Sequence, residues 1–232
     1  MTAGVGPEDG CASALESSTP SSAPARPSLQ PRSTKKTFMT PSALTIIRNE
    51  HQALAAILHA LRRTVTDIRD RAAKPNFEVL RALLFYIDAY PERLHHPKET
   101  NHLFKRLRER SSEATAVLDK LDQDHHRGEE EILRLEHQLL EFEMLGASRL
   151  PAFVAAVELY CDRYMEHMHT EEHEVLPLAR QVLTEPDWAA INAEFEANRD
   201  PLTGHKPEKE FELLFSRIAN LLPPPLGLGS GE

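Results

Sequence analysis

Histidine is the side chain whose number and placement first point to chemistry in this sequence. The chain has 232 residues, 12 of them histidine. Some histidines interrupt stripes of apolar residues that recur every three or four positions, namely His51, His95, His125 and His167. The two glutamates that follow such a histidine by four residues are Glu99 and Glu171. In a helix this spacing puts imidazole and carboxylate on one face, so both can reach one centre.

The arrangement repeats along the chain, because in each half a lone histidine precedes a His-x-x-x-Glu pair. If two similar helical hairpins face each other, the six side chains lie at one level. Four nitrogen donors and two carboxylates able to bridge suit a pair of transition-metal ions, whereas calcium and magnesium prefer all-oxygen sites. A single histidine in an apolar stripe is more often a hydrogen-bonded core residue. Two inward-facing glutamates have no such explanation, since a buried carboxylate needs a partner or a metal ion.

Helices are the elements that must position these residues. The apolar stripes predict an all-α protein with four helices of roughly 30 residues, antiparallel because their loops are short, and two shorter C-terminal helices. Pro91 and Pro97 are expected to bend the second helix at the site itself. The predicted helix breaks are Lys74-Pro75-Asn76, Ser111-Ser112, Gly146-Ala147-Ser148, Thr184-Glu185-Pro186 and Asn198-Arg199-Asp200-Pro201.

Composition limits the class of protein further. A formal net charge of −9 argues against a nucleic-acid scaffold, and no apolar run is long enough to cross a membrane. The first residues lack the features of a secretory signal, and two cysteines predict a reducing, cytoplasmic compartment. The predicted organisation is a disordered arm (1–40), a helical bundle (41–183), a helical extension (184–221) and a Pro/Gly-rich tail (222–232).

Four separated segments resemble the hemerythrin-like HHE cation-binding family of bacteria. They are NEHQAL (49–54), HHPKETNHLFKRL (95–107), DQDHHRGEEEI (122–132) and YMEHMHTEEHEVLPLA (164–179). The resemblance implies an up-down-up-down antiparallel four-helix bundle that holds a non-haem diiron centre. Carried over by position, the terminal ligands would be His51, His95, His125 and His167, and the bridging carboxylates Glu99 and Glu171.

The sequence departs from oxygen-carrying hemerythrins on the third helix. Those proteins have a His-x-x-x-His pair there, and this chain has Glu129 four residues after His125. The loss of one nitrogen ligand argues against simple oxygen carriage and favours relatives that respond to iron, oxygen or nitric oxide. Three candidates for the surroundings of the metal ligands are His102, Glu129 and Tyr164.

Other polar residues compete for attention near the six. Helical geometry turns His96 and His126 about 100° off the stripe, so both are expected to be partly exposed, with either one a substitute ligand. Glu172 is turned about 140° from His167, which favours Glu171 as the ligand. His169 and His173 are four residues apart, yet the segment is not an H-E-x-x-H motif, and a solvated face is expected.

Six protein ligands leave open positions around two octahedral ions, which are compatible with an oxo, hydroxo or water bridge. The first hypothesis is therefore a diiron protein that binds or responds to oxygen, nitric oxide or peroxide. The alternatives are an iron storage, delivery or repair protein, a zinc-stabilised helical module, or a weak oxidase or peroxidase. No catalytic residue and no protein partner is predicted.

Overall fold

The computed structural model describes residues 43–197, 200–205, 209 and 212–221. All of them fall within the unit Met39–Glu232. The predicted disordered arm (1–40) and tail (222–232) lie outside the described residues. In the described part of the chain all regular structure is helical, which confirms the all-α class. None of these described helices combines the length and the apolar character needed to span a lipid bilayer.

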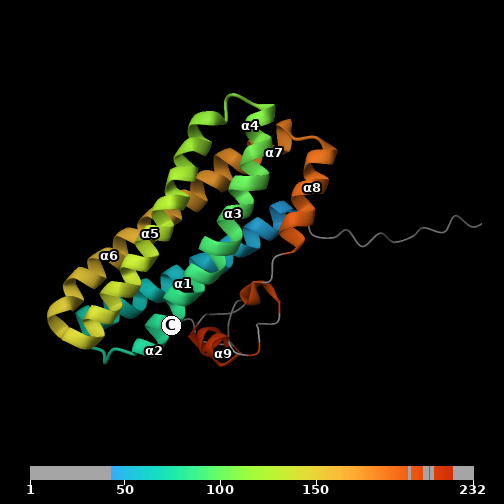
Figure 1. Ribbon diagram of the computed structural model, residues 1–232. Coiled ribbons are helices and arrows are strands. Elements are labelled where there is room, and N and C mark those ends of the chain that lie inside the picture. The colour runs from blue at the N-terminus through green and yellow to red at the C-terminus, as the bar shows by residue number, and fades with distance from the viewer. Residues whose placement is uncertain (1–42, 198–199, 206–208, 210–211, 222–232) are drawn as a thin grey trace, which may run out of the picture. The chain divides into compact units, whose positions relative to one another are not determined.

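Long α-helices form the frame of this unit (Figure 1). Their ends follow the predicted breaks. The side chain of Asn76 accepts a hydrogen bond from the backbone N–H of Val79 at 3.2 Å and so caps the helix that begins at Phe77. Gly146 ends another helix with a φ of 83°, a conformation that glycine adopts without strain. The bounds are α1 (Ala43–Arg71), α2 (Phe77–Ile87), α5 (Thr115–Leu145) and α6 (Leu150–Thr170).

Beyond α2 the second helical rod alternates between α-helical and wider π-helical turns. Proline has no N–H to donate, and a π-turn moves the hydrogen-bonding pattern by one residue, so the rod continues past Pro91 and Pro97. The two prolines thus coincide with a change in helical period. The segments are η1 (Asp88–His95), α3 (His96–Lys98), η2 (Glu99–Phe104) and α4 (Lys105–Arg110).

The rod that begins with α6 also alternates between α-helical and π-helical turns. A π-helical segment, η4 (Glu171–Val175), follows α6, and α7 (Leu176–Val182) carries Pro177 in its first turn. In both rods the glutamate of the His-x-x-x-Glu pair is the first residue of a π-helical segment. Since π-turns often occur at functional sites, their position beside both pairs is informative.

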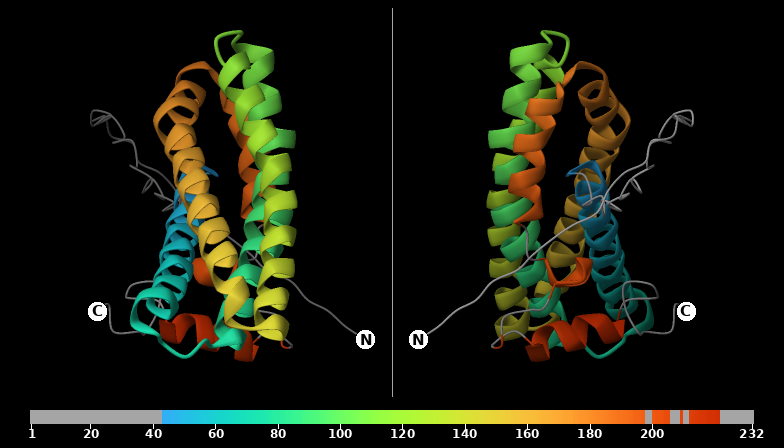
Figure 2. Two further views of the ribbon diagram at one scale, coloured as in Figure 1. Left: turned by 90° about the vertical axis from the view of Figure 1, so that its left-hand side faces the viewer. Right: turned by 90° about the vertical axis from the view of Figure 1, so that its right-hand side faces the viewer.

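The rods pack in a closed ring of neighbours, because α1 contacts α2 and α6, and α5 contacts α2 and α6. The two predicted C-terminal helices are α8 (Glu185–Glu196) and α9 (Glu212–Leu221). Helix α8 packs on α1 and η2 and has a capping box in which Thr184 and Asp187 bond each other's backbone. Figure 2 shows α9 lying across the end of the rods beside α2, which it contacts.

Two apolar clusters fill the interior. Along each helix, the polar residues come between residues of one cluster and residues of the other. On α1, Ile47 belongs to one cluster and Leu54 to the other, with His51 between them. On α5 the corresponding boundary residues are Leu121 and Ile132. The histidines that interrupt the stripes are thus enclosed by apolar walls, which exclude water and strengthen electrostatic interactions.

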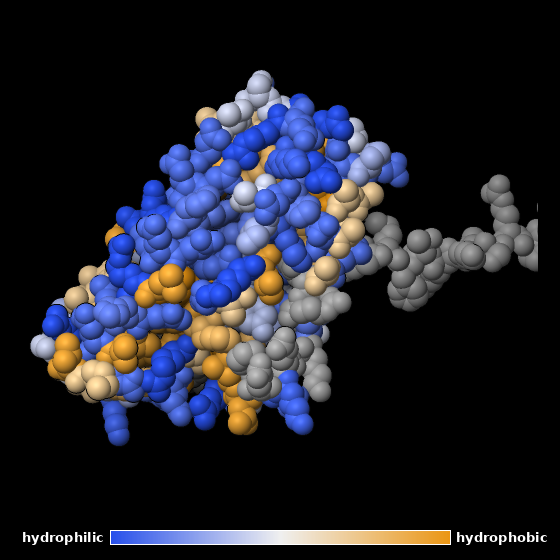
Figure 3. Space-filling model, in the orientation of Figure 1, coloured by the Kyte–Doolittle hydropathy of each residue, from blue (hydrophilic) through white to orange (hydrophobic). Residues whose placement is uncertain are grey.

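The outer surface is largely polar. Figure 3 shows one mostly hydrophilic face, with hydrophobic patches toward the end where α5 turns into α6. Exposed apolar side chains on α5 include Leu140, Met144 and Leu145. Scattered exposed residues of this kind are ordinary in folded proteins. Charged side chains at the centre of the unit are not ordinary and need a specific explanation.

The segment after α8 is tied to α2 through Asp200. This carboxylate is buried, accepts a hydrogen bond from the hydroxyl of Tyr86 at 2.7 Å, and accepts another from the backbone N–H of Leu202 at 2.9 Å. Burial raises the pKa of Asp200 to about 6, although both hydrogen bonds lower it. The folded protein therefore keeps a proton that the unfolded chain releases between about pH 4 and pH 6.

Asp200→Asn is expected to raise the free energy of unfolding at pH 7 by about 2 to 3 kcal/mol. The stability that the raised pKa provides is complete below about pH 4 and is lost as the pH rises to 6, so at pH 7 the native carboxylate is ionised at a cost. An amide resembles the protonated acid and avoids this cost. Urea unfolding at pH 7 and pH 4 measures the effect. An equal gain at both pH values would contradict the explanation.

Candidate metal centre

The six predicted ligands converge from different helical segments on one buried position. Each of these residues is at most 5% exposed. They are His51 on α1, His95 on η1, Glu99 on η2, His125 on α5, His167 on α6 and Glu171 on η4. In the described residues His51, His95 and Glu99 bring nitrogen and oxygen atoms within 4.8 Å of one another, as do Glu99, His125, His167 and Glu171. The structure therefore brings all six together, in two overlapping groups.

The histidines form two pairs. The Nε2 atoms of His51 and His95 lie 3.2 Å apart, and those of His125 and His167 are also separated by 3.2 Å. Two ligand atoms that each lie about 2.1 Å from one ion, at tetrahedral or octahedral angles, are about 3.0 to 3.4 Å apart. Each pair therefore has the spacing of two ligands of the same ion.

The two glutamates extend across both histidine pairs. Glu99 places Oε1 3.3 Å from Nε2 of His95 and Oε2 3.6 Å from Nε2 of His125. Glu171 does the same from the other side, since Oε2 lies 3.2 Å from Nε2 of His51 and Oε1 lies 3.3 Å from Nε2 of His167. Each carboxylate thus offers one oxygen to each pair, as a carboxylate that bridges two ions does.

The chemistry of these donors favours a bound cation. None of the four oxygens of Glu99 and Glu171 makes a hydrogen bond within the described residues, although all are buried. Two imidazole nitrogens at 3.2 Å need either the N–H proton of one ring or a metal ion between them. A buried carboxylate without a partner costs several kcal/mol, so the donor set fits transition-metal ions.

The pKa values of the histidines also indicate that the site favours positive charge. Burial lowers the pKa of His95, but the charge of Glu99 and the bond to Glu50 raise it well above its ordinary value. The pKa of His167 is raised to about 10, because the charge of Glu171 outweighs burial. Without metal the site would hold protons instead, and metal binding must displace them.

A second layer of polar groups holds the outer nitrogens of the imidazoles. His95 Nδ1–H donates to Glu50 at 2.7 Å, and His51 Nδ1–H donates to Glu172 at 3.0 Å. The other two outer nitrogens face Thr100, at 2.9 Å from His125, and Asp124, at 3.8 Å from His167. The hydrogen bonds to His51, His95 and His125 fix the tautomer of these three rings, so that Nε2 presents its lone pair inward, whereas Nδ1 of His167 has no hydrogen-bond partner among the described residues.

Sequence reasoning missed this second layer, although Glu50 directly precedes a predicted ligand. Glu172 was set aside as a ligand in favour of Glu171, and it is not among the clustered donors of the described residues; its carboxylate instead accepts a hydrogen bond from the outer nitrogen of His51. Both Glu171 and Glu172 lie at the start of the π-helical segment η4. The prolines close to both pairs were the only signal of these wider turns.

His96 was expected to be partly exposed, and that prediction is wrong. It is 5% exposed and stacks on His125, with ring centroids 4.0 Å apart. One group of mutually close candidate donors consists of His96, His125 and His167. His96 Nδ1–H donates to Glu92 at 3.0 Å, so Nε2 has a lone pair. His96 can therefore serve as a third nitrogen donor for one histidine pair. His126, the other substitute considered, is exposed.

Of the three residues predicted to surround the metal ligands, the structure places one beside the site and two away from it. Tyr164 is buried beside the site, where its hydroxyl donates to Glu92 at 2.8 Å and lies 3.1 Å from Nε2 of His96. His102 was expected to point inward, but its side chain is 30% exposed and lies 3.8 Å from Glu194. The π-turns of η2 rotate it off the inner face. Glu129 is exposed, so it does not line the site.

Glu92 is the centre of a buried network next to this half of the site. It is 1% exposed and also accepts a hydrogen bond from the hydroxyl of Tyr160 at 3.0 Å. Burial raises the pKa of Glu92 to about 7, against the lowering effect of its tyrosine hydrogen bonds. Gly128 makes room for this carboxylate, since a Cβ there would lie 2.8 Å from Glu92 Oε1.

Gly128→Ala is expected to destabilise the protein by about 1 to 2 kcal/mol, although alanine favours a helix by up to about 1 kcal/mol. The carboxylate of Glu92 cannot retreat, because Tyr160, Tyr164 and His96 hold it. Urea unfolding measures the change. In a Glu92→Ala background the same substitution is expected to be neutral or stabilising. A loss of equal size in both backgrounds would contradict the steric explanation.

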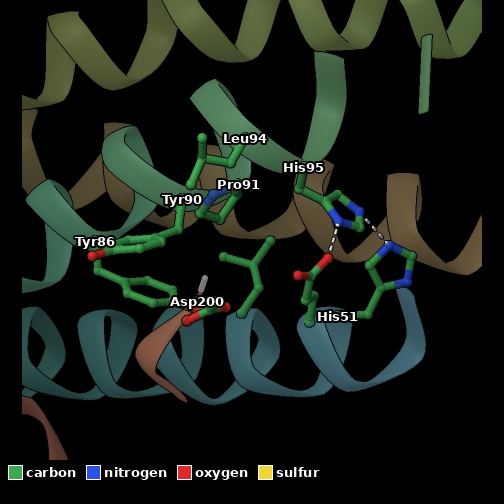
Figure 4. Close-up of a pocket in the computed structure, with 9 residues that line it drawn as sticks. His51, Tyr86, Tyr90, Pro91, Leu94, His95 and Asp200 are labelled. Atoms are coloured by element: carbon green, nitrogen blue, oxygen red, sulfur yellow. Dashed lines mark hydrogen bonds and ion pairs between the residues drawn. The ribbon is translucent and has the colours of Figure 1, made fainter. Parts of the chain in front are cut away.

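Small pockets reach each half of the site. Figure 4 shows the first, with His51 and His95 turned toward each other at one end and Tyr86, Tyr90 and Asp200 at the other. The second pocket lies on the opposite half. Its lining includes His96, Gly128, Tyr160, Tyr164 and His167, together with the charged residues Asp124, Arg127, Glu131 and Arg163. A small molecule could approach either histidine pair.

Fold and site together define a helical protein with a buried histidine and glutamate cluster suited to binding metal ions. A family model described as the hemerythrin HHE cation-binding domain matches residues 42–179, more than half of the chain. The chain belongs to this family. Comparisons with curated proteins and with solved structures found no match.

Proposed function

We propose that the chain is a non-haem diiron protein that binds or responds to a small ligand such as oxygen, nitric oxide or peroxide. The observation that carries the proposal is the pair of buried glutamates, Glu99 and Glu171. Each offers one oxygen to each histidine pair, and none of their four oxygens accepts a hydrogen bond from the described residues. The proposal includes an up-down-up-down antiparallel four-helix bundle as the scaffold, supported by the ring of contacts among α1, α2, α5 and α6. It also keeps the predicted reducing, cytoplasmic setting, supported by the small number of cysteines, two in the whole chain.

The donor set supports iron. Imidazole together with carboxylate is a ligand combination that iron accepts, and thiolates, which structural zinc sites often use, are missing from the cluster of described residues. With both carboxylates bridging, the six side chains fill roughly two thirds of the positions around two six-coordinate ions. His96 would fill one more. When bound, the iron pair supplies redox chemistry and open positions for an exogenous ligand.

The chain's own residues prepare the site for such a ligand. Glu50, Glu172 and Thr100 orient three imidazoles through their outer nitrogens. The apolar clusters on both sides keep water away from the donors. Tyr164, whose hydroxyl donates to Glu92, places its oxygen beside His96 at the second pocket. The apolar walls of the first pocket, with Leu54 and Leu94, suit a small uncharged molecule.

Metal analysis combined with absorption spectroscopy tests the proposal. We expect two irons per chain and a near-ultraviolet band of the oxidised protein that dithionite bleaches and that changes on addition of nitric oxide, oxygen or peroxide. A colourless protein loaded with zinc would contradict the iron assignment. Bound iron whose spectrum ignores all three ligands would contradict ligand response and favour storage, delivery or repair.

A further inference from the structure

His169 and His173 form an exposed imidazole pair that the proposed iron centre does not use. They occupy the last turn of α6 and the π-helical segment η4, and both are exposed, as the sequence predicts. Their rings stack with centroids 4.0 Å apart and planes inclined by 28°. Two imidazoles at this spacing on one helix face can close on a single transition-metal ion.

The hydrogen bonding of His173 prepares it for that role. Its Nδ1–H donates to the backbone carbonyl of His169 at 2.9 Å. This bond assigns the proton to Nδ1 and leaves Nε2 with a lone pair directed away from the backbone. Metal-binding histidines commonly donate their second nitrogen to a carbonyl or a carboxylate in this way.

The pair borders an open groove that extends to the buried site. Its lining includes His169, His173, Glu172 and the thioether side chains of Met165 and Met168, and it extends to His51. Glu172 accepts the hydrogen bond from His51 Nδ1, so one carboxylate lies between the surface pair and a proposed ligand of the iron centre. The groove thus offers imidazole, carboxylate and thioether donors on the way inward.

Arg48 also lines this groove, and its charge acts against a cation. The positive charge of Arg48 would weaken the tight cation binding that permanent storage needs. A site that captures an ion briefly and releases it benefits from weak binding.

We propose that His169 and His173 capture a divalent transition-metal ion at the surface, and that the groove through Glu172 is the route by which ions enter the protein. The capture site stands on the exposed pair alone, whereas its entry role rests on the proposed iron centre. Hard cations such as calcium and magnesium are excluded, because the primary donors are imidazoles.

Nickel titration of the full-length protein, already loaded with metal and freed of excess, tests the capture site. Calorimetry should detect one further Ni²⁺ per chain, and the His169→Ala/His173→Ala variant should lose it. The matched control, His59→Ala/His137→Ala, removes two exposed histidines from α1 and α5 and should retain it. Absence of the extra ion, or its survival in the first variant, would overturn the proposal.

The entry role is tested with the metal-free protein and limiting Fe²⁺, by stopping uptake with a chelator and counting protein-bound iron. The His169→Ala/His173→Ala variant should load several-fold more slowly than the control and reach the same final iron content. Equal loading rates would overturn the entry role. If neither protein retains iron, the proposed iron centre fails, while the nickel titration still decides the surface site.

Discussion

Glu171→Gln is expected to lower the metal content of the protein from the proposed two ions per chain to fewer than one. The amide is neutral and cannot offer one charged oxygen to each histidine pair, so both ions lose a ligand. Removing one partner of a buried charged group costs about 3 to 5 kcal/mol, which corresponds to an affinity loss of about 100- to 1,000-fold or more. Elemental analysis after gel filtration measures the metal content.

The matched control is Glu129→Gln, which changes the charge equally at an exposed position one turn after His125. It should keep both ions. Glu171→Gln should remain helical, because a neutral amide inside a cluster of imidazoles can still accept a hydrogen bond. Far-ultraviolet circular dichroism checks this. Full metal content in a folded Glu171→Gln variant would remove this residue from the ligand set.

Removing the metal is expected to lower the melting temperature by about 15 °C or more. Each ion present at a thousand times its dissociation constant stabilises the folded state by about 4 kcal/mol. For a chain of this size each kcal/mol is worth about 2 to 4 °C. The physical reason lies in the site, because without metal the four oxygens of Glu99 and Glu171 have no hydrogen bond from the described residues, and four imidazoles lie close together. Calorimetry before and after chelation measures the shift.

Re-adding Fe²⁺ should restore the melting temperature, which separates metal loss from irreversible damage. The Glu171→Gln variant provides the second comparison, since chelator should hardly change its melting temperature. A chelator effect of equal size in the variant and the native protein would show that the stabilising metal binds elsewhere.

Much of the architecture follows from periodicity alone. The apolar stripe from Ile47 to Ile68 predicts a helix that the structure has as α1, and Gly146 ends α5 where the sequence predicts a break. The convergence of the six ligand candidates was predictable for the same reason. A polar residue that takes an apolar position of a core-facing stripe is carried into the interior by the packing of its neighbours.

The second helical rod shows the limit of that reasoning. A regular helix of about 100° per residue predicts that His96 is off the inner face and His102 on it, and the structure reverses both. The cause is the run of π-helical turns in η1 and η2 around Pro91 and Pro97. A proline predicts a local irregularity of the helix. The missing hydrogen bond does not show whether the irregularity is a bend or a widened turn, because it is compatible with both.

The sequence by itself determined that the chain is helical and that its histidines and glutamates interrupt apolar stripes, because both properties depend on residue type and spacing along one helix. Only the tertiary structure decided that Glu50 and Glu172 hold the outer nitrogens, that His96 stacks on His125, and that Gly128 makes room for Glu92. These contacts join separate helices or depend on π-turns, so they arise from how the rods pack and rotate against one another.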